Sequence, residues 1–279
     1  MQFKPPVTAD ISLELSELLD QALVAKRESE PPRMYLGASL IGHFCERYLG
    51  YQFHKAPPDE PQFDGRIFRV FDMGHDGEER MAEYIRLAGF DLRTHREDGR
   101  QFGWGAGKNE DGQDQIKGHI DGVIVDGPQI VGLHYPCIWE NKALSNKSWK
   151  DTKDKGVRSS KPVYFGQMQI NAAYLDVPTS LFTAMNRDTG EIYAEVVEFD
   201  ARHAQELSDK GVRVVKSRSP DELPQGGHGP TDYRCKMCSW RVTCWEKKAA
   251  VPQLPQPTPN WLQNLGGSNG NNQEEGDQT

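Results

Sequence analysis

A glutamate and a lysine stand two residues apart in "PCIWENKAL", residues 136–144. In a β-strand, residues i and i+2 point to the same face, so Glu140 and Lys142 would lie side by side. Such a pair is either a surface ion pair of little energetic value or half of a metal-dependent active site. The spacing alone leaves both interpretations open.

A second carboxylate precedes this stretch, in "GHIDG". If Asp121 and Glu140 lie on neighbouring strands, their oxygens suit a hard divalent ion such as Mg²⁺. Such an ion activates water and neutralises charge on a phosphodiester during hydrolysis. Lys142 would then contact the attacking water or the developing charge. The alternative is that Asp121 is an ordinary turn residue and that Glu-x-Lys occurs by chance.

A cysteine-rich stretch, "YRCKMCSWRVTCW", places Cys235, Cys238 and Cys244 in a Cys-x₂-Cys-x₅-Cys pattern. Three thiolates at this spacing favour a soft metal ion or an iron–sulfur cluster. The fourth ligand could be Cys45 or Cys137. Because Cys137 lies three residues before Glu140, it should point to the opposite face of its strand, and we interpret it as a buried apolar residue. A Cys₄ zinc site is the alternative. Two Cys-x₂-Cys knuckles would favour zinc, but only one is present in the sequence.

Composition limits the possible settings. The chain of 279 residues has a net charge of −8, which argues against a uniformly basic nucleic-acid coat but not against a local basic channel. The sequence contains no run of 18 apolar residues, so we expect no membrane span, and the N-terminus lacks a secretory pattern. We therefore expect a cytoplasmic protein without disulfide bonds, since an odd number of cysteines, five, is present.

Positive charge gathers in residues 145–162, "SNKSWKDTKDKGVRSSKP". We expect a loop there that either grips phosphates without reading sequence or is simply solvated. Trp149 within it could stack on a base or anchor the loop to the core. The candidate phosphate-binding residues are Lys147, Lys150, Lys153, Lys155, Arg158 and Lys161.

The remaining sequence predicts elements that would position these groups. Apolar spacing favours helices over 10–26, 37–53 with Ser39 as a possible N-cap, 65–88 ending at Gly89, 163–177 and 201–218. Alternation favours strands in "FDLRTH", "QIKGHIDGVIVDG", "PCIWENKAL", "SLFTAMN" and "EIYAEVVEFD". The order predicts an α/β layered domain over 34–250, preceded by a helix and linker over 1–33. Residues 251–279 read as a disordered acidic tail that could bind a protein partner.

These motifs together resemble a known family. "GHIDGV" followed by "IWENKAL" is similar to the Asp…Glu-x-Lys signature of the PD-(D/E)XK nucleases, with Ile120 in place of a proline, as in their RecB-like branch. That branch also carries a helical Gly-His, here His75, and a Gln…Tyr helix, here "GQMQINAAYL". The tyrosine is displaced to position 174. One cysteine before the core and three after it resemble the branch's iron–sulfur members, which include CRISPR-associated RecB-like exonucleases and AddB-type subunits.

The resemblance implies a restriction-endonuclease-like core, with a central mixed sheet flanked by helices. It further implies a [4Fe–4S] cluster that joins the N- and C-terminal segments, with Cys45, Cys235, Cys238 and Cys244 as ligands. Mg²⁺ or Mn²⁺ would be held by His75, Asp121, Glu140 and the backbone carbonyl of Asn141. Ile138 would face the same way and shield the metal, while Cys137 and Trp139 face the core.

The remaining roles follow from the same resemblance. Lys142 would position the water, Gln167 or Gln169 with Tyr174 would orient the motif or the DNA, and Glu79 would assist through a metal-bound water. The implied activity is a DNA exonuclease acting at single-stranded ends, in recombination, repair, or phage or CRISPR DNA processing, in a bacterial or phage-infected cell. The alternative is a catalytically idle iron–sulfur DNA-binding or adaptor protein.

Overall fold

The computed structural model of the protein describes residues 9–60 and 63–246. Its helices are α1 (Ala9–Ser29), α2 (Ala38–Ile41), α3 (Glu46–Phe53), α4 (Gly65–Leu87), α5 (Asn146–Ser160), α6 (Pro162–Leu175), α7 (Ala201–Lys216), a 3₁₀ turn (Pro220–Glu222), α8 (Tyr233–Lys236) and α9 (Arg241–Trp245). Its strands are β1 (Leu36–Gly37), β2 (Leu92–Arg93), β3 (Gly103–Lys108), β4 (Asp114–His119), β5 (Gly122–Ile124), β6 (Cys137–Leu144), β7 (Thr179–Asn186) and β8 (Ile192–Glu198). The predicted acidic tail over 251–279 lies outside the described residues.

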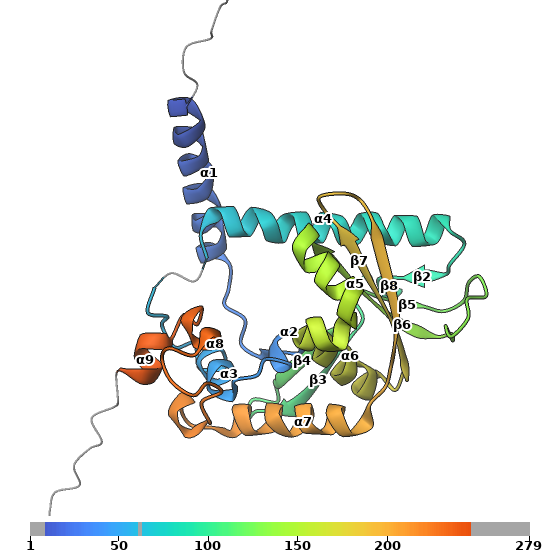
Figure 1. The fold of residues 1–279 in the computed structure, drawn as a ribbon. Coiled ribbons are helices and arrows are strands. Elements are labelled where there is room, and N and C mark those ends of the chain that lie inside the picture. The colour runs from blue at the N-terminus through green and yellow to red at the C-terminus, as the bar shows by residue number, and fades with distance from the viewer. Residues whose placement is uncertain (1–8, 61–62, 247–279) are drawn as a thin grey trace, which may run out of the picture.

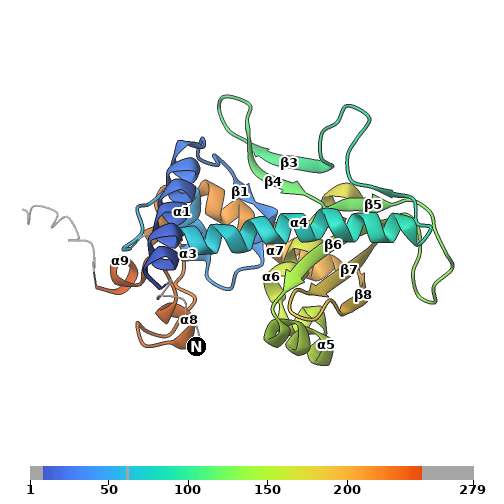
Figure 2. The ribbon, with the colours of Figure 1, turned by 90° about the horizontal axis from the view of Figure 1, so that it is seen from above.

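The strands form two mixed sheets. The larger has the order β2-β5-β6-β7-β8, with β6 and β7 parallel and the other neighbours antiparallel. The smaller has the order β1-β4-β3, in which β3 and β4 make an antiparallel hairpin and β1 runs parallel to β4. Helices α4 and α7 lie on opposite sides of this layered body, as Figures 1 and 2 show. The expected mixed α/β architecture with flanking helices is confirmed.

Strand β6 is the middle strand of the larger sheet, and it is covered on both faces. Cys137 and Trp139, both without solvent exposure, pack with Met81 of α4 on one face. Ile138 packs with Ile120 on the other face. A strand covered on both sides is expected to be apolar at successive positions, as this one is up to residue 139. The predicted alternation, with Cys137 and Trp139 turned away from Glu140, agrees with this packing.

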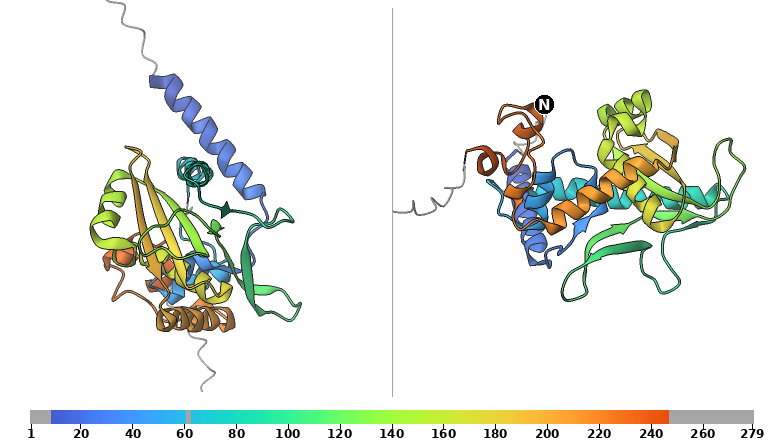
Figure 3. Two further views of the ribbon diagram at one scale, coloured as in Figure 1. Left: turned by 90° about the vertical axis from the view of Figure 1, so that its right-hand side faces the viewer. Right: turned by 90° about the horizontal axis from the view of Figure 1, so that it is seen from below.

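Helix α4 is the long helix that crosses β6, and its predicted bounds were nearly correct. Asp64 caps its N-terminus by accepting a hydrogen bond from the Ile67 amide at 2.9 Å. Gly89, with φ at +91°, follows its end. At Gly77 an added Cβ would come within 3.2 Å of the Ala143 Cβ, so the missing side chain lets α4 approach β6 closely. The left view of Figure 3 looks along this helix.

The predicted single helix over 37–53 is wrong, because two helices form there. Helix α2 ends at Ile41 and α3 begins at Glu46. A Cβ on the intervening Gly42 would meet Val163 Cα at 2.7 Å, so the glycine lets the turn between the two helices pack tightly against the start of α6. Ser39 is not the N-cap, since Gly37 holds that position without a side-chain bond. Cys45 instead caps α3, with its Sγ accepting from the Tyr48 amide at 3.4 Å.

The predicted basic loop over 145–162 is also wrong, because most of it forms helix α5. Ser145 caps the helix, and Gly156, at φ +72°, kinks it. The buried residues of this helix are Trp149, Thr152 and Val157. Trp149 is 3% exposed and donates its Nε1 hydrogen to the Ala184 carbonyl at 3.0 Å. It therefore anchors the helix to the sheet and is not available to stack on a base.

Two differences in the strands affect the site. The predicted strand "QIKGHIDGVIVDG" is split into β4 and β5, with Ile120 and Asp121 between them. Strand β3, "GWGAGK", was not predicted because its alternating glycines weaken the usual strand pattern.

No described helix is long and apolar enough to cross a membrane.

Candidate active site and four-cysteine cavity

The acidic residues meet where β5 stops pairing with β6. The last pair of that ladder is Gly122 with Trp139, so Glu140, Asn141 and Lys142 extend past β5. Asp121 lies at this open edge and accepts the Asn141 amide hydrogen on Oδ2 at 2.8 Å. The carboxylate thus replaces a missing strand partner. This contact brings Asp121 and the Glu-x-Lys segment together, as the sequence predicted.

A single ammonium holds the oxygens of this cluster. Lys142 Nζ lies 2.5 Å from Glu140 Oε1 and 3.7 Å from Asp121 Oδ2. It also donates to the Asn141 carbonyl oxygen at 2.8 Å. Glu140 has no solvent exposure, whereas the Lys142 side chain is 22% exposed. Lys142 therefore stands between the three oxygen groups that the sequence assigned to a metal ion.

A third carboxylate, Glu78 of α4, acts on the same cluster. Burial, and next the charge of Asp121, raise the pKa of Glu78 to about 7, against an opposing effect of Lys142. Burial and Asp121 also raise the pKa of Glu140, again against Lys142. Burial alone would lower the pKa of Lys142, but the two neighbouring carboxylates outweigh it and raise the pKa. Three acids thus share one cation.

This imbalance fits a divalent cation. Glu140 Oε2 is buried and has no hydrogen-bond partner among the described residues, which is costly for a carboxylate oxygen. Asp121, Glu140 and the Asn141 carbonyl supply the oxygen ligands that Mg²⁺ or Mn²⁺ prefers. Within residues 9–60 and 63–246, no three His, Cys, Asp or Glu side chains are already arranged around one metal position. A cation would therefore compete with Lys142 for these oxygens.

Two predicted residues of α4 make no hydrogen bond or ion pair with the described residues of the cluster. His75 and Glu79 are exposed, and neither makes a hydrogen bond or ion pair with a described residue. Their predicted roles as metal ligand and assisting acid stay predictions. Glu78 is the residue that the sequence reasoning missed. The helical period offered a signal, because Gly77, Met81 and Ile85 are buried and so turn position 78 inward and 79 outward.

The two glutamines of α6 have different surroundings. Gln169 is 1% exposed, donates to the Glu198 carbonyl at 3.0 Å and accepts the Asp200 amide at 2.7 Å. Its amide therefore fastens α6 to the end of β8. Gln167 is also buried, but its side chain makes no hydrogen bond with a described residue. Of the two candidates, Gln167 has the side chain that is free to act on another group.

Asn171 and Tyr174 fasten the β3–β4 hairpin to α6. Asn171 is fully buried, accepts the Trp104 Nε1 hydrogen at 2.8 Å and donates to the His119 carbonyl at 3.1 Å. Tyr174 stacks on Trp104 with ring centroids 3.9 Å apart, and its hydroxyl lies 3.3 Å from Ser208 Oγ. No contact of either side chain with Asp121 or the Glu-x-Lys segment is found among the described residues.

The basic residues of α5 are partly neutralised. Asp151 pairs with Lys155 at 2.6 Å and with Lys161 at 3.2 Å, and Arg158 pairs with Asp200 at 3.0 Å. Lys153 lies over the Trp149 ring at 4.9 Å. Lys147 and Lys150 are exposed and form no ion pair with a described carboxylate. Less free positive charge is therefore available here than the sequence suggested.

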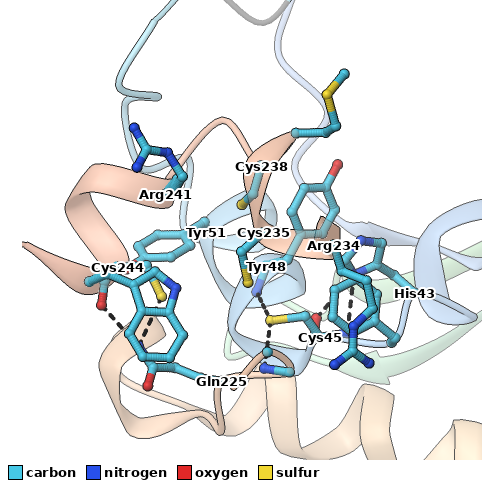
Figure 4. Close-up of a pocket in the computed structure, with 15 residues that line it drawn as sticks. His43, Cys45, Tyr48, Tyr51, Gln225, Arg234, Cys235, Cys238, Arg241 and Cys244 are labelled. Atoms are coloured by element: carbon cyan, nitrogen blue, oxygen red, sulfur yellow. Dashed lines mark hydrogen bonds between the residues drawn. The ribbon is translucent and has the colours of Figure 1, made fainter. Parts of the chain in front are cut away.

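The second candidate site is a cavity of about 190 Å³ lined by four cysteines (Figure 4). Cys45 stands just before α3, Cys235 lies in α8, Cys238 follows it and Cys244 lies in α9. The fold therefore brings Cys45 to the C-terminal cysteines across the chain. Cys137 instead begins β6 and lies in the core, which agrees with its predicted role as a buried apolar residue.

Several N–H groups point at these sulfurs. Cys45 Sγ accepts hydrogen bonds from the amides of Tyr48 and Gly226, at 3.4 and 3.2 Å, and Cys244 Sγ accepts from the Gln225 side chain at 3.2 Å. Burial first, and then the charges of the other three cysteines, raise the pKa of Cys238, although a hydrogen bond from the Trp240 backbone opposes them. These thiols are thus close enough to repel one another as thiolates.

Four cysteine sulfurs at one cavity are donors that either a soft metal ion or an iron–sulfur cluster takes. Four thiolates around one Zn²⁺ must converge to about 2.3 Å from a common point. Among the described residues, no three of these cysteines are arranged around one metal position. They line a cavity instead, with N–H donors that tune iron–sulfur clusters in general.

Protein contacts already join the segments on either side of this cavity. Trp240 stacks on Tyr51 at 5.4 Å and donates its Nε1 hydrogen to the Ala56 carbonyl at 3.1 Å. The Asp59 carboxylate accepts the Val242 amide at 2.7 Å. Protein contacts therefore join the two segments near the cysteines, and the iron–sulfur cluster that was expected to join them stays a prediction.

Comparisons with known proteins find distant structural similarity and no match by sequence. No protein-family model matches the sequence, and neither does any curated protein. Among solved structures, the crystal structure of SSO0001 is similar at 14% identity and a TM-score of 0.46, covering 82% of this chain and 96% of its own. An alkaline exonuclease, LHK-Exo from Laribacter hongkongensis, is similar at 14% identity and a TM-score of 0.42, covering 71% of this chain and 90% of its own. LHK-Exo in complex with dAMP is similar at 15% identity and a TM-score of 0.41, covering 72% and 90%. A likeness this distant assigns no activity to the chain.

Proposed function

We propose that the protein is a metal-dependent DNA nuclease whose active site is the cluster of Asp121, Glu140 and Lys142. The observation that carries this proposal is the buried Glu140 Oε2, which lacks a partner among the described residues while three carboxylates share one ammonium. A structural ion pair would leave neither the unpaired oxygen nor the excess negative charge. A divalent cation would bind the unpaired oxygen and neutralise the excess negative charge.

The residues divide the work of phosphodiester hydrolysis. Asp121, Glu140 and the Asn141 carbonyl would hold Mg²⁺ or Mn²⁺, which supplies Lewis-acid activation of water and neutralises phosphate charge. In the metal-free protein the Glu140 and Asp121 carboxylates raise the pKa of Lys142, so its ammonium is a hydrogen-bond donor there. It orients a water or stabilises a phosphoryl oxygen. The Gln167 amide, unpaired among the described residues, would orient the same groups.

We further propose that the substrate is DNA with single-stranded ends and that the reaction is exonucleolytic, as in recombination, repair or phage and CRISPR DNA processing. The four cysteines would hold a [4Fe–4S] cluster with a structural role. Its support is the cavity that joins the Cys45 segment to the C-terminal helices, together with the N–H groups aimed at the sulfurs.

Incubation with end-labelled single-stranded DNA and Mn²⁺ tests the activity. Wild type should release mononucleotides or short fragments from linear DNA and leave single-stranded circles intact. Glu140→Gln should abolish cleavage, and the exposed Glu198→Gln should cleave like wild type. If wild type binds DNA but cleaves no more than Glu140→Gln does, the protein is a binding or adaptor protein and the nuclease proposal fails.

Elemental analysis of anaerobically purified protein tests the cluster. Wild type should contain about four irons per chain and show broad thiolate-to-iron absorption in the visible range. Cys45→Ser should lose both, whereas Cys137→Ser should keep both, because Cys137 lies in the core of the sheet. One zinc per chain without iron would contradict the cluster.

A further inference from the structure

A row of side chains on the smaller sheet leads to the acidic cluster. Along β4, buried Ile116, Gly118 and Ile120 alternate with the less buried Lys117 and His119. Asp121 continues this second series. Because residues i and i+2 of a strand share a face and lie about 6–7 Å apart, Lys117 and His119 form a track that ends at a proposed metal ligand.

An aromatic ring with two cations lies beside this track. Strand β1 runs parallel to β4 with Leu36 opposite Ile116, which brings the preceding Tyr35 next to the row. Lys117 Nζ lies 5.1 Å from the centre of the Tyr35 ring, and Arg33 Cζ also lies 5.1 Å from it. No described carboxylate forms an ion pair with either cation. Their charges are therefore available to a ligand.

The neighbouring strand leaves this face uncovered. Strand β3 places glycines opposite the row, Gly103 across from His119 and Gly105 across from Lys117. The His119 ring fills the space over Gly103, since an added Cβ would lie 2.9 Å from its Cδ2. Glycines in a strand are typical of places where another backbone approaches closely.

Besides Asp121, the carboxylate of Asp114 lies near this face, and it is already engaged. The Asp114 carboxyl group occupies the space over Gly105. It pairs with Lys108 at 2.6 Å, so it does not neutralise Lys117. The face therefore keeps a net positive charge beside the acidic cluster, although the chain as a whole is acidic, at −8. A local positive track in an acidic protein favours an anionic ligand at that place.

We propose that Arg33, Tyr35 and Lys117 bind single-stranded DNA and guide its end to Asp121 and Glu140. The inference rests on the proposed nuclease function for what happens at that end. The two cations, which lie over the Tyr35 ring, would move to phosphates, and a base would stack on the ring in place of a cation. This combination suits a single strand, because the bases of a duplex are stacked on one another and their faces are not accessible.

Fluorescence anisotropy of a labelled oligothymidylate tests the surface in EDTA, where no hydrolysis takes place. The double variant Arg33→Gln/Lys117→Gln should weaken binding roughly tenfold and reduce the slope of log K against log salt by about 1–2. Tyr35→Leu should weaken binding roughly five- to hundredfold, while Tyr35→Phe should bind like wild type. Lys216→Gln, at the exposed end of α7, removes one charge elsewhere and should bind like wild type.

The outcomes separate this surface from the nuclease proposal. If the double variant and Tyr35→Leu both bind DNA as tightly as wild type, the proposed DNA-binding surface is overturned. It is also overturned if the wild-type protein binds a duplex as tightly as a single strand, or more tightly. Loss of binding in these variants supports it, provided that their thermal midpoints match wild type and that Tyr35→Phe retains affinity. If these losses occur while wild type cleaves no DNA in Mn²⁺, the surface stands and the nuclease proposal alone fails.

Discussion

Lys142 Nζ and Glu140 Oε1 lie 2.5 Å apart and form an ion pair in which the carboxylate has no solvent exposure. A pair of this kind differs from an exposed one because both ions lose hydration when they are buried. The Asp121 and Glu78 carboxylates add negative charge that one ammonium cannot balance. This imbalance of charge is the observation on which the proposed metal site rests.

Removal of the ammonium should destabilise the metal-free protein strongly. In Lys142→Met, the Glu140 carboxylate would be buried without its cation, which typically costs about 3–5 kcal/mol. Urea denaturation in EDTA measures the loss. The double variant Glu140→Gln/Lys142→Met should recover most of it, because no buried charge remains. If the double variant is as unstable as Lys142→Met, the loss comes from packing and not from the unpaired carboxylate.

Glu78 and Glu79 should respond differently to the same substitution. Glu78→Gln removes a charge that Asp121 repels, so the metal-free protein should gain on the order of 1 kcal/mol, and Mn²⁺ should raise its melting temperature less than that of wild type. The exposed Glu79→Gln should match wild type in both measurements. Thermal melting with and without Mn²⁺ provides the comparison. An effect confined to Glu79→Gln would restore the role that the resemblance implied for that residue.

The resemblance predicted the meeting of Asp121 with Glu140, which the spacing of the residues alone had left open, and Asp121 lies between β4 and β5 and not within the predicted strand. For Glu78 the helical period indicates that position 78 lies nearer the buried face of α4 than position 79, but its approach to Asp121 depends on how α4 packs against β6, through the contact of Gly77 with Ala143. The choice between Gln167 and Gln169 likewise depends on where β8 ends.

The errors in the flanking elements have a common cause. Helix α5 was read as a loop because its surface is rich in lysine and aspartate, while the Trp149 contact that anchors it is made with a distant strand. Strand β3 was missed because its glycines carry no side-chain pattern. In both segments the long-range contacts override local propensity, and a single sequence does not reveal such contacts.

Cys137 should make stability depend on alkaline pH. Burial raises the pKa of its thiol to about 11 from an ordinary value near 9. Between these values the unfolded chain loses the thiol proton and the folded chain keeps it, so the free energy of unfolding falls as pH rises from about 9 to about 11, by at most about 2–3 kcal/mol. Cys137→Ala should lack this contribution, which appears as the difference between the two pH profiles in urea denaturation. Parallel profiles over this range would contradict the buried, neutral thiol.

Gln167 and Gln169 should separate activity from stability. In Gln169→Ala, the Glu198 carbonyl and the Asp200 amide lose their partner, at a cost of about 1–3 kcal/mol for each group left unpaired, while cleavage by the folded fraction should be retained. In Gln167→Ala, unfolding should change little, but the cleavage rate should fall about tenfold, equivalent to about 1.4 kcal/mol in the barrier. Urea denaturation and single-turnover cleavage of the two variants provide the test. If Gln169→Ala loses cleavage at full stability while Gln167→Ala does not, the motif glutamine is Gln169.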